Sequence, residues 1–463
     1  MTDIETAEGA PARDLTDELA AYAAGIRIAE VPEVVRRQAI LCILDTIGCC
    51  VAGAQVEDWK PLMAAESADS ARPECTVIGT GRRLSTEAAA RVNAYMGDIL
   101  NLHDQIGGHG SIGNVCGLVA LAESQRSSGR ALLEAVIVGL EVTARVYQGY
   151  FAAIKPYDEV GMTPVVFPSS YGVAAGAARL LGLGEPGLAH AMGIAGTLAG
   201  WCPAEVVFGN GGTVKPMLYG ACPATAGLAG AKYARAGMTG PKRLLEGPRG
   251  YFVTAARGMF AEAVRDNRTW HLASPPRKYH AACGYIHSPV DAVVSLRRDG
   301  VRLEEAAEIR IGVAELTLAG VSKQGPPRSG NEARFHLEYC VALAALGEDV
   351  ILPEHSIGFA RHAARPEILR MLDKVRIVAD PARKHFHHCA VTVVDAAGRA
   401  LARREVHGPK GAPRNPMSDD EVLGKFRRLV EYRLAGAALD AYLERALRLE
   451  SQPDSDWLMA AFG

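Results

Sequence analysis

The stretch PEVVRRQAILCILDTIG, residues 32–48, decides how the first half of this chain folds. Its proline stands in the first turn, where a helix tolerates it, and the residues that follow from 39 to 48 are apolar nearly all round. A helix without a polar face must be surrounded by other elements, so we expect it to lie at the centre of a helical domain. Asp45, within this apolar stretch, is expected to be a buried, hydrogen-bonded carboxylate with a structural role.

The segments around this helix also have helical character. A disordered tail is expected over residues 1–13, and a first helix is predicted to start near residues 14–16. From Ser85 to about Gly240 the chain is rich in Ala, Gly, Leu and Val, and helical spacing recurs over residues 131–147, 170–183 and 187–200. The many small residues indicate helices that pack closely, backbone to backbone.

The character of the sequence changes after about Asn267. Alternating residues predict strands over 307–313, 375–380, 390–395 and 400–406, with the second and third as a pair and a hairpin turn at 396–399. Helices are expected over residues 335–346 and 366–372, and again from Ser418 onward.

These patterns predict a mainly α-helical chain of two domains. A tail helix that rejoins the first helices makes the segment between them an insertion. We therefore expect a large all-helical domain formed by both chain ends, residues 14–266 and 407–463, with a smaller α+β domain inserted at residues 267–406.

Composition excludes several classes of partner. The chain has 463 residues, of which 49% are hydrophobic and 22% charged, and its net charge of −2 offers no basic excess for nucleic acid or an anionic membrane. No charge-free apolar run approaches the roughly 20 residues that span a bilayer. The acidic, polar N-terminus has no secretory character, and the ten cysteines contain no CxxC pair, so reduced thiols in a cytoplasmic protein are expected.

The stretch NLHDQIGGHGS, residues 101–111, is the first candidate for chemistry. It joins two apolar helical segments, and its glycines allow a sharp turn close to a ligand. Imidazole exchanges protons near neutral pH, and an adjacent carboxylate can orient it. The dipeptide His103-Asp104 thus predicts proton transfer at this loop.

Several stretches together resemble the MmgE/PrpD family. They are LDTIGCCVAG at 44–53, GLEV at 139–142, VKPMLYG at 214–220, GMTGP at 237–241, Lys278-Tyr279 with Cys283 and His287, and NPMS at 415–418 leading to Lys425-Phe426. The family contains dehydratases, decarboxylases and epimerases of small carboxylates. The resemblance implies a homodimer, an inserted α+β lid domain, and catalysis without metal or organic cofactor.

The resemblance also implies which cations hold the substrate. Lys215, isolated in the neutral stretch 209–216, and Lys278, near the domain junction, occupy the positions of the family's two lysines. Both are expected to be catalytic and to bind carboxylates, with Arg277 and Tyr279 beside the second.

The loop matches the family pattern only in part. His109 stands at the family's histidine position and is expected to be the main acid or base, with His103 and Asp104 as an assisting pair. Asn101 and Thr163 stand where relatives carry an aspartate and a histidine, and Gln105 stands where threonine is common. We expect these three residues to contact substrate, and the two lost titratable groups favour an altered substrate or proton path.

A second histidine cluster, residues 385–389 (HFHHC), contains side chains that can ligate zinc or another transition metal. His387 and Cys389 are expected on one face of a strand and His388 on the other, so the polar edge of a hairpin is the preferred interpretation and no metal is predicted.

Together, these features predict a lyase of the dehydratase type that acts on a small di- or tricarboxylate by proton transfer next to a carboxylate. The alternatives are an epimerase or isomerase, a decarboxylase of a related carboxylate, and a homologue that binds carboxylates without catalysis.

Overall fold

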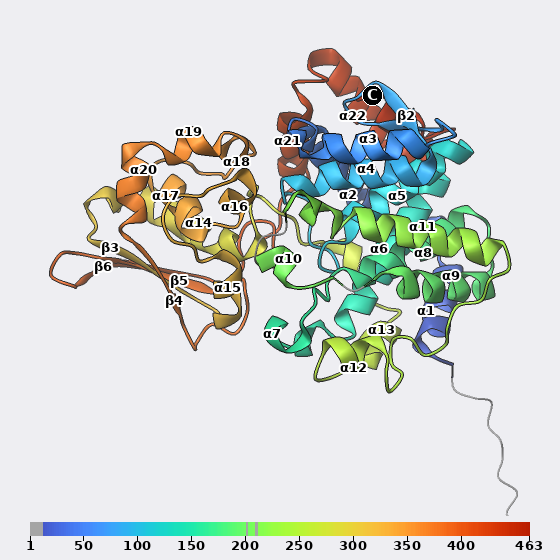
Figure 1. Ribbon diagram of the computed structural model, residues 1–463, viewed down its shortest axis with the longest axis horizontal. Helices are drawn as coiled ribbons and strands as arrows, with labels where there is room; N and C mark the ends of the chain where they lie inside the picture. Colours follow the sequence, from blue (N-terminus) through green and yellow to red (C-terminus); the bar gives the residue numbers. More distant parts are fainter. Residues whose placement is uncertain (1–12, 201, 209–211) are drawn as a thin grey trace, which may run out of the picture.

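The computed structural model describes residues 13–200, 202–208 and 212–463. The predicted tail of residues 1–13 lies outside them except for Arg13, as do residues 209–211 before Lys215. Figure 1 shows two bodies, a large helical one and a smaller α+β one, and the first and last helices of the chain lie in the same helical body. The predicted mainly α fold with a small α+β part is confirmed.

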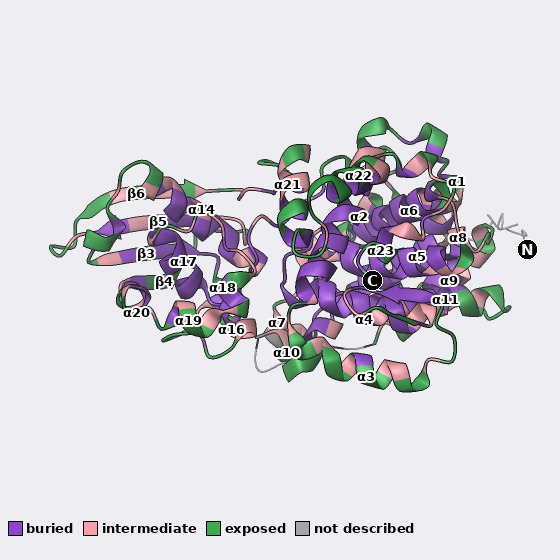
Figure 2. Cartoon of the chain, turned by 90° about the horizontal axis from the view of Figure 1, so that it is seen from above, coloured by how far each residue is buried: buried purple, intermediate pink, exposed green. Residues whose placement is uncertain are grey.

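The helical body is built around α2 (Glu33–Gly53), the helix predicted to be central. Sixteen of its 21 residues are buried, and α4, α5, α6 and α21 all pack against it. Figure 2 shows this buried interior extending through the neighbouring helices. The helices of this body are α1 (Leu15–Gly25), α2, α3 (Lys60–Asp69), α4 (Thr86–Ile99), α5 (Gly110–Gln125), α6 (Gly129–Gln148), α7 (Tyr157–Val160), α8 (Phe167–Leu180), α9 (Glu185–Leu198), α10 (Glu205–Phe208), α11 (Ala221–Arg235), α12 (Tyr251–Ala255), α13 (Ala261–Arg265), α21 (Asp419–Val430), α22 (Gly436–Leu447) and α23 (Trp457–Ala460).

Small residues let these helices approach closely, as the composition predicted. A Cβ added at Gly53 of α2 would lie 1.9 Å from the carbonyl oxygen of Met96 in α4, and one at Gly172 of α8 would lie 1.9 Å from Oγ1 of Thr143 in α6. Contacts at these distances are impossible for any residue with a side chain. Glycine is therefore required where these helix pairs cross.

The helical body is not entirely helical, which corrects the expectation of an all-helical domain. Strands β1 (Cys75–Val77) and β2 (Arg82–Leu84) form an antiparallel hairpin next to α4. Each strand has only three residues, too few for an alternating pattern to be recognised in the sequence.

The α+β body contains a four-stranded sheet in the order β4-β3-β5-β6. The strands β3 (Glu308–Val313), β4 (Val375–Ala379), β5 (Cys389–Val394) and β6 (Ala400–Val406) match the predicted segments, and β5 and β6 form the predicted hairpin. The predicted pairing of the second and third segments is wrong. Both instead flank β3, with β4 parallel and β5 antiparallel to it, because the most apolar strands take the centre of the sheet.

Helices cover one face of this sheet and complete its core. α14 (Gly284–Arg298), which the sequence analysis missed, packs with α17 (Leu337–Ala345) against the strands. The remaining helices of this body are α15 (Leu318–Val321), α16 (Gly330–Arg334), α18 (Glu354–Ile357), α19 (Phe359–Ala363) and α20 (Pro366–Leu372). Its core, residues 282–393, is separate from the core of the helical body, which draws on residues 15–281 and 417–462.

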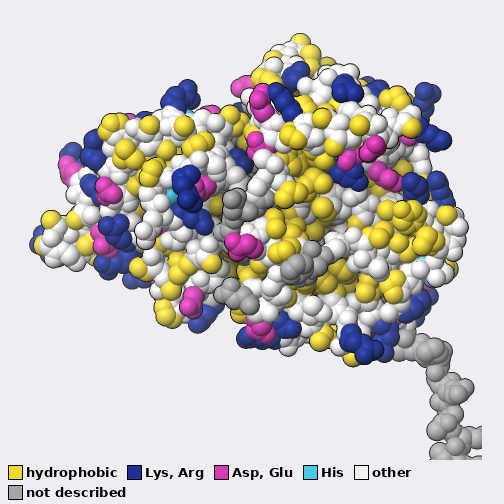
Figure 3. All heavy atoms as spheres, viewed as in Figure 1, with side chains coloured by type: hydrophobic (Ala, Val, Ile, Leu, Met, Phe, Trp, Pro, Cys, Tyr) yellow, Lys and Arg dark blue, Asp and Glu magenta, His cyan; other side chains and the backbone are white. Residues whose placement is uncertain are grey.

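The surface and the helix lengths bear on possible partners. On the face drawn in Figure 3, hydrophobic side chains gather over the helical body, while charged side chains are scattered around its margin and over the α+β body. Among the described residues, no single helix is long and apolar enough to cross a membrane. One pair of helices bent by 90°, Glu33–Gly53 with Glu57–Asp69, passes the same test by length and composition.

Candidate active site

A small cavity of about 70 Å³ lies where the two bodies meet. The helical body contributes the loop after α4, the end of α6 and Tyr219, and the α+β body contributes the start of α14, Phe335 and Phe386. Of the residues predicted for the site, Asn101, Gln105, His109 and Lys278 line this cavity directly. Most of the remaining wall is aromatic, so the polar groups that reach the cavity are few.

His109 is held rigidly in the cavity wall. It occupies the N-cap position of α5 without a side-chain capping hydrogen bond, and its ring stacks on Tyr219 with 4.0 Å between ring centroids. Gly107 and Gly108 precede it with φ of 56° and 96°, so the predicted sharp turn requires these glycines. Burial, followed by the charge of Lys278, holds the pKa of His109 well below its usual range, and the ring is therefore neutral.

A second imidazole supports His109 from behind. Nε2 of His103 lies 2.7 Å from Nδ1 of His109, a hydrogen bond in which one ring donates and the other accepts. Nδ1 of His103 faces Asp98 of α4, with 3.7 Å to Oδ1, and both side chains are completely buried. Burial lowers the pKa of His103 well below its usual range and raises that of Asp98 to about 6.

Lys278 enters the cavity from the segment before α14. Its ammonium donates to the backbone oxygen of Asn101 at 2.9 Å and to the side-chain oxygen of the same residue. Asn101 adopts φ of 50°, a left-handed conformation that asparagine tolerates better than most residues. The partners of Lys278 are thus neutral, and burial lowers its pKa to about 8.

Lys215 lies in the helical turn Gly212–Met217, behind two aromatic residues of the wall. Its Nζ is 4.2 Å from the ring centre of Phe335 and 5.7 Å from that of Tyr219, and it is only 2% exposed. Within the described part of the chain it has no carboxylate within 4.0 Å, and burial lowers its pKa to about 8. Lys215 therefore has no direct ion-pair partner among the described residues, although Asp98 acts on it from a greater distance.

Arg334 of α16 adds a third buried cation to this region. It is 4% exposed, and it donates to the hydroxyl of Ser356 at 3.2 Å. The charge of Asp98 acts on Arg334, Lys215 and Lys278, raising the pKa of each against the opposing effect of burial. Asp58 acts on Arg334 more strongly than Asp98 does, so the positive charge that a bound anion would balance is mainly that of the two lysines.

Lys425 of α21 fixes the loop and the lysine segment to each other. It pairs with Asp45 at 2.7 Å and donates to the backbone oxygens of Leu102 and Lys278 at 2.8 and 2.9 Å. Asp45 is therefore the buried carboxylate that the sequence predicted, bound through an ion pair. Helix α21, from the last part of the chain, sets the position of the candidate site through this contact.

Two predicted residues lie on the side of their segment opposite the cavity. Arg277 donates to Oε1 of Gln38 in α2 at 2.7 Å, and Tyr279 lines a different cavity of about 690 Å³ that also includes Lys425. Successive side chains of an extended segment point to opposite sides, so Lys278 alone of the three faces the candidate site.

The predicted residues of the loop, and Thr163, also differ in whether they face the cavity. Asp104 turns away from His103 and accepts from the backbone N–H of Ile106 at 3.2 Å, and burial raises its pKa to about 6. Gln105 reaches the cavity beside Gly284. Thr163 is buried, its N–H donates to the carbonyl oxygen of Cys202 at 2.8 Å, and it is not among the cavity-lining residues.

The second histidine cluster forms a turn. Residues 385–388 precede β5, which corrects the expected strand, and Ser288 donates to the backbone oxygen of His387 at 2.7 Å. Across the described ranges, no group of three or more His, Cys, Asp or Glu side chains is arranged to hold a metal ion. The turn instead places Phe386 against the candidate site.

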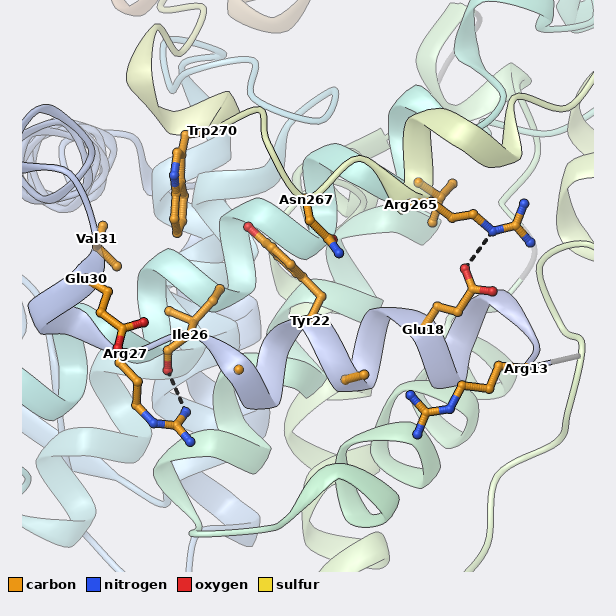
Figure 4. A pocket seen from close by; sticks show the side chains of 13 residues that line it. Arg13, Glu18, Tyr22, Ile26, Arg27, Glu30, Val31, Arg265, Asn267 and Trp270 are labelled. Atoms are coloured by element: carbon orange, nitrogen blue, oxygen red, sulfur yellow. Dashed lines mark hydrogen bonds and ion pairs between the residues drawn. The ribbon is translucent and has the colours of Figure 1, made fainter.

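A larger cavity of about 740 Å³ lies beside α1, away from these residues. Figure 4 shows Glu18 and Arg265 paired with each other and Arg27 bonded to the backbone of Ile26. Nε of Arg265 lies 2.7 Å from Glu18, and Arg27 donates to the carbonyl oxygen of Ile26 at 3.0 Å. None of the described residues that line it is a histidine or a lysine, so we place the candidate active site in the smaller cavity.

Sequence reasoning missed Asp98, Arg334 and Tyr219. Asp98 follows Ala94-Tyr95-Met96-Gly97 in a stretch as apolar as the one around Asp45, and a lone carboxylate there was a usable signal. Arg334 and Tyr219 carry no such signal, because their positions depend on how the two bodies meet.

Known proteins are similar to this chain over nearly its whole length. The model of the MmgE/PrpD N-terminal domain matches residues 17–262, and that of the C-terminal domain matches residues 280–449. The chain is 27% identical to the cis-aconitate decarboxylase-like protein oryM of Aspergillus oryzae, with 98% of each chain covered. It is 25% identical to a cis-aconitate decarboxylase of Aspergillus terreus, over 90% of this chain and 89% of that one, and 23% identical to that of Mus musculus, over 96% and 92%. The resemblance found in the sequence is thus confirmed, and the chain belongs to the MmgE/PrpD family.

Proposed function

We propose that this protein is a lyase that acts on a small di- or tricarboxylate by proton transfer next to a carboxylate, with no metal or organic cofactor. One observation carries the proposal. Lys278 lines the cavity with His109, Lys215 is buried behind the aromatic wall of that cavity, and within the described residues neither lysine has a carboxylate within 4.0 Å. Burying a cation without a counter-ion is unfavourable, and an anionic substrate removes that cost.

The residues that line the cavity, together with Lys215 behind its aromatic wall, can supply each part of the chemistry. The two ammonium groups hold carboxylates and stabilise the negative charge that develops as a carbon–carbon or carbon–hydrogen bond breaks. Asn101 contributes by being neutral, since a carboxylate at that position would neutralise Lys278. His109 presents Nε2, which has no hydrogen-bond partner in the described part of the chain, as the group that exchanges the proton.

Decarboxylation is the first choice among the lyase reactions. The sequence alone placed dehydration first, but the relatives named above are cis-aconitate decarboxylases or proteins like them. In a decarboxylation CO2 leaves, its bonding electron pair stays on the carbon and delocalises into the adjacent unsaturated system, and the acid of the site returns one proton to carbon. The expected homodimer belongs to the same proposal, and light scattering should find twice the mass of one chain.

Proton NMR in heavy water tests the reaction. The protein is incubated with cis-aconitate and a panel of small unsaturated and hydroxylated di- and tricarboxylates. We expect loss of CO2 with one solvent deuteron at carbon. A new double bond without CO2 loss identifies a dehydratase, and washout of a proton without either identifies an epimerase.

Two lysine variants make the test specific to the site. Lys278→Gln should abolish the reaction, whereas Lys232→Gln, at an exposed lysine of α11, should retain it. If no substrate of the panel changes with the unmodified protein, the enzyme proposal fails and carboxylate binding alone remains.

A further inference from the structure

Three titratable groups lead from the cavity into the protein interior. His109 lines the cavity, its Nδ1 is 2.7 Å from Nε2 of His103, and Nδ1 of His103 is 3.7 Å from Oδ1 of Asp98. Apart from the contact with His103, neither carboxylate oxygen of Asp98 has a side-chain partner among the described residues; the backbone of Tyr219 acts on Asp98, and the backbone of Gly97 acts on His103. The order carboxylate, imidazole, imidazole ends at Nε2 of His109, where a substrate would lie.

The arrangement of these three groups would let His109 exchange a proton without its ring becoming charged. Burial of the ring, followed by the charge of Lys278, disfavours a positive imidazolium at His109. A neutral imidazole that gives away its Nε2 proton becomes an anion unless Nδ1 receives another proton at once. His109 by itself is therefore a poor base and a poor acid.

We propose that His103 is a positioning residue that relays protons between His109 and Asp98, so that the buried carboxylate stores the proton that His109 exchanges with substrate. The inference rests on the proposed function and goes beyond it by assigning roles to two further residues.

The relay conserves charge on both rings. When Nε2 of His109 takes a proton, its Nδ1 proton passes to Nε2 of His103, and the Nδ1 proton of His103 passes to Asp98. Both imidazoles end neutral with their tautomers exchanged, and Asp98 has become a carboxylic acid. Reversing the three transfers lets His109 donate a proton to carbon and returns Asp98 to its ionised form.

The distances and surroundings suit this role. The bond between the rings is already formed, and the contact with Asp98 must shorten by about 1 Å, a change of the kind that substrate binding commonly produces. The other charged groups that act on the relay are Lys215, Lys278, Lys425 and Arg334, all of them cations. They favour ionised Asp98, while burial raises its pKa to about 6, so both of its forms are accessible near neutral pH.

Nitrogen-15 NMR of the ligand-free protein with labelled histidines tests the relay without any substrate. We expect the rings of His103 and His109 to stay neutral between pH 5 and 8 and to exchange tautomers together, with one midpoint near 6. Asp98→Asn should remove that midpoint. Asp104→Asn should keep it, because this equally buried carboxyl faces away from the rings. Any of three results would overturn the relay: two separate midpoints, signals of an imidazolium, or a tautomer exchange with the same midpoint in Asp98→Asn.

Kinetics supply a second readout if turnover is found. His103→Gln can still accept the hydrogen bond from His109 but cannot pass a proton on. We expect kcat to fall by about 10²-fold or more with KM within about threefold. When turnover is measured in mixtures of H2O and D2O, the rate of the unmodified protein should depend on the deuterium fraction along a curve. The rate of His103→Gln should depend on it linearly.

His355→Gln, at a buried histidine of α18, controls for the loss of a buried ring. An unchanged kcat in His103→Gln contradicts the relay. Absence of turnover in the unmodified protein counts against the proposed function alone, because the NMR titration still decides the relay.

Discussion

Binding of a small tricarboxylate should weaken steeply as the pH rises through 8, because Lys215 and Lys278 must both be charged to hold it. Burial lowers the pKa of each lysine to about 8, more than two units below the usual value. The binding form is the protonated one, so affinity is fully present below pH 8 and is lost above it.

The size of the effect follows from these values. At pH 9 a lysine with a pKa of about 8 is roughly 10% protonated, which weakens binding by about tenfold, or about 1.4 kcal/mol. Two such lysines give about 10²-fold between pH 7 and pH 9. Because the bound anion raises both pKa values, each lysine should gain about half a proton when the ligand binds at pH 8, so the total uptake is about one proton. At pH 7 the total uptake should be only about 0.2 of a proton.

Isothermal titration calorimetry measures both quantities. Tricarballylate, a saturated tricarboxylate without the double bond, serves as a ligand that is not turned over, and titrations in buffers of different ionisation enthalpy count the protons. Lys278→Gln should leave a dependence on a single lysine, about tenfold between pH 7 and 9, while Lys232→Gln should match the unmodified protein. An affinity that stays constant to pH 9.5, without proton uptake, would refute the assignment of these lysines.

Three further outcomes follow from the structure. His109→Gln should lower kcat by about 10²-fold or more while the protein remains folded if the ring exchanges the proton with substrate, as we propose; steady-state kinetics and circular dichroism decide this. Asp45→Asn should lower the free energy of unfolding by about 3–5 kcal/mol in urea denaturation, because it leaves the buried ammonium of Lys425 without its partner. Gly53→Ala should destabilise the protein in the same assay by about 1–3 kcal/mol, since its Cβ would overlap the oxygen of Met96, whereas Gly25→Ala, with nothing within 4 Å, should not.

Local patterns were enough for most of the fold. The apolar stretch around Asp45 predicted a central helix because no side of it can face water, and α2 is that helix. Alternation located all four strands of the larger sheet, but it could not decide their order, since pairing depends on contacts between distant segments. The hairpin β1–β2 was too short to leave a pattern.

The same contrast between local pattern and tertiary contact holds for the candidate site. The sequence by itself determined the family, because the stretches that carry the resemblance are spread over most of the chain, and it singled out Lys215, Lys278 and His109 as candidates for the chemistry. Only the tertiary structure decided which neighbours join them. It turned Arg277 toward α2 and Asp104 away from His103, since adjacent side chains of an extended segment diverge.

Tertiary structure also supplied what the sequence did not indicate. Asp98 is separated from His109 by a helix end and a loop, and Arg334 belongs to the other body, yet folding gathers their charges around one small cavity. The sequence determines which groups can titrate. The fold decides which of them are buried together, and burial is the physical cause that moves their pKa values toward neutrality.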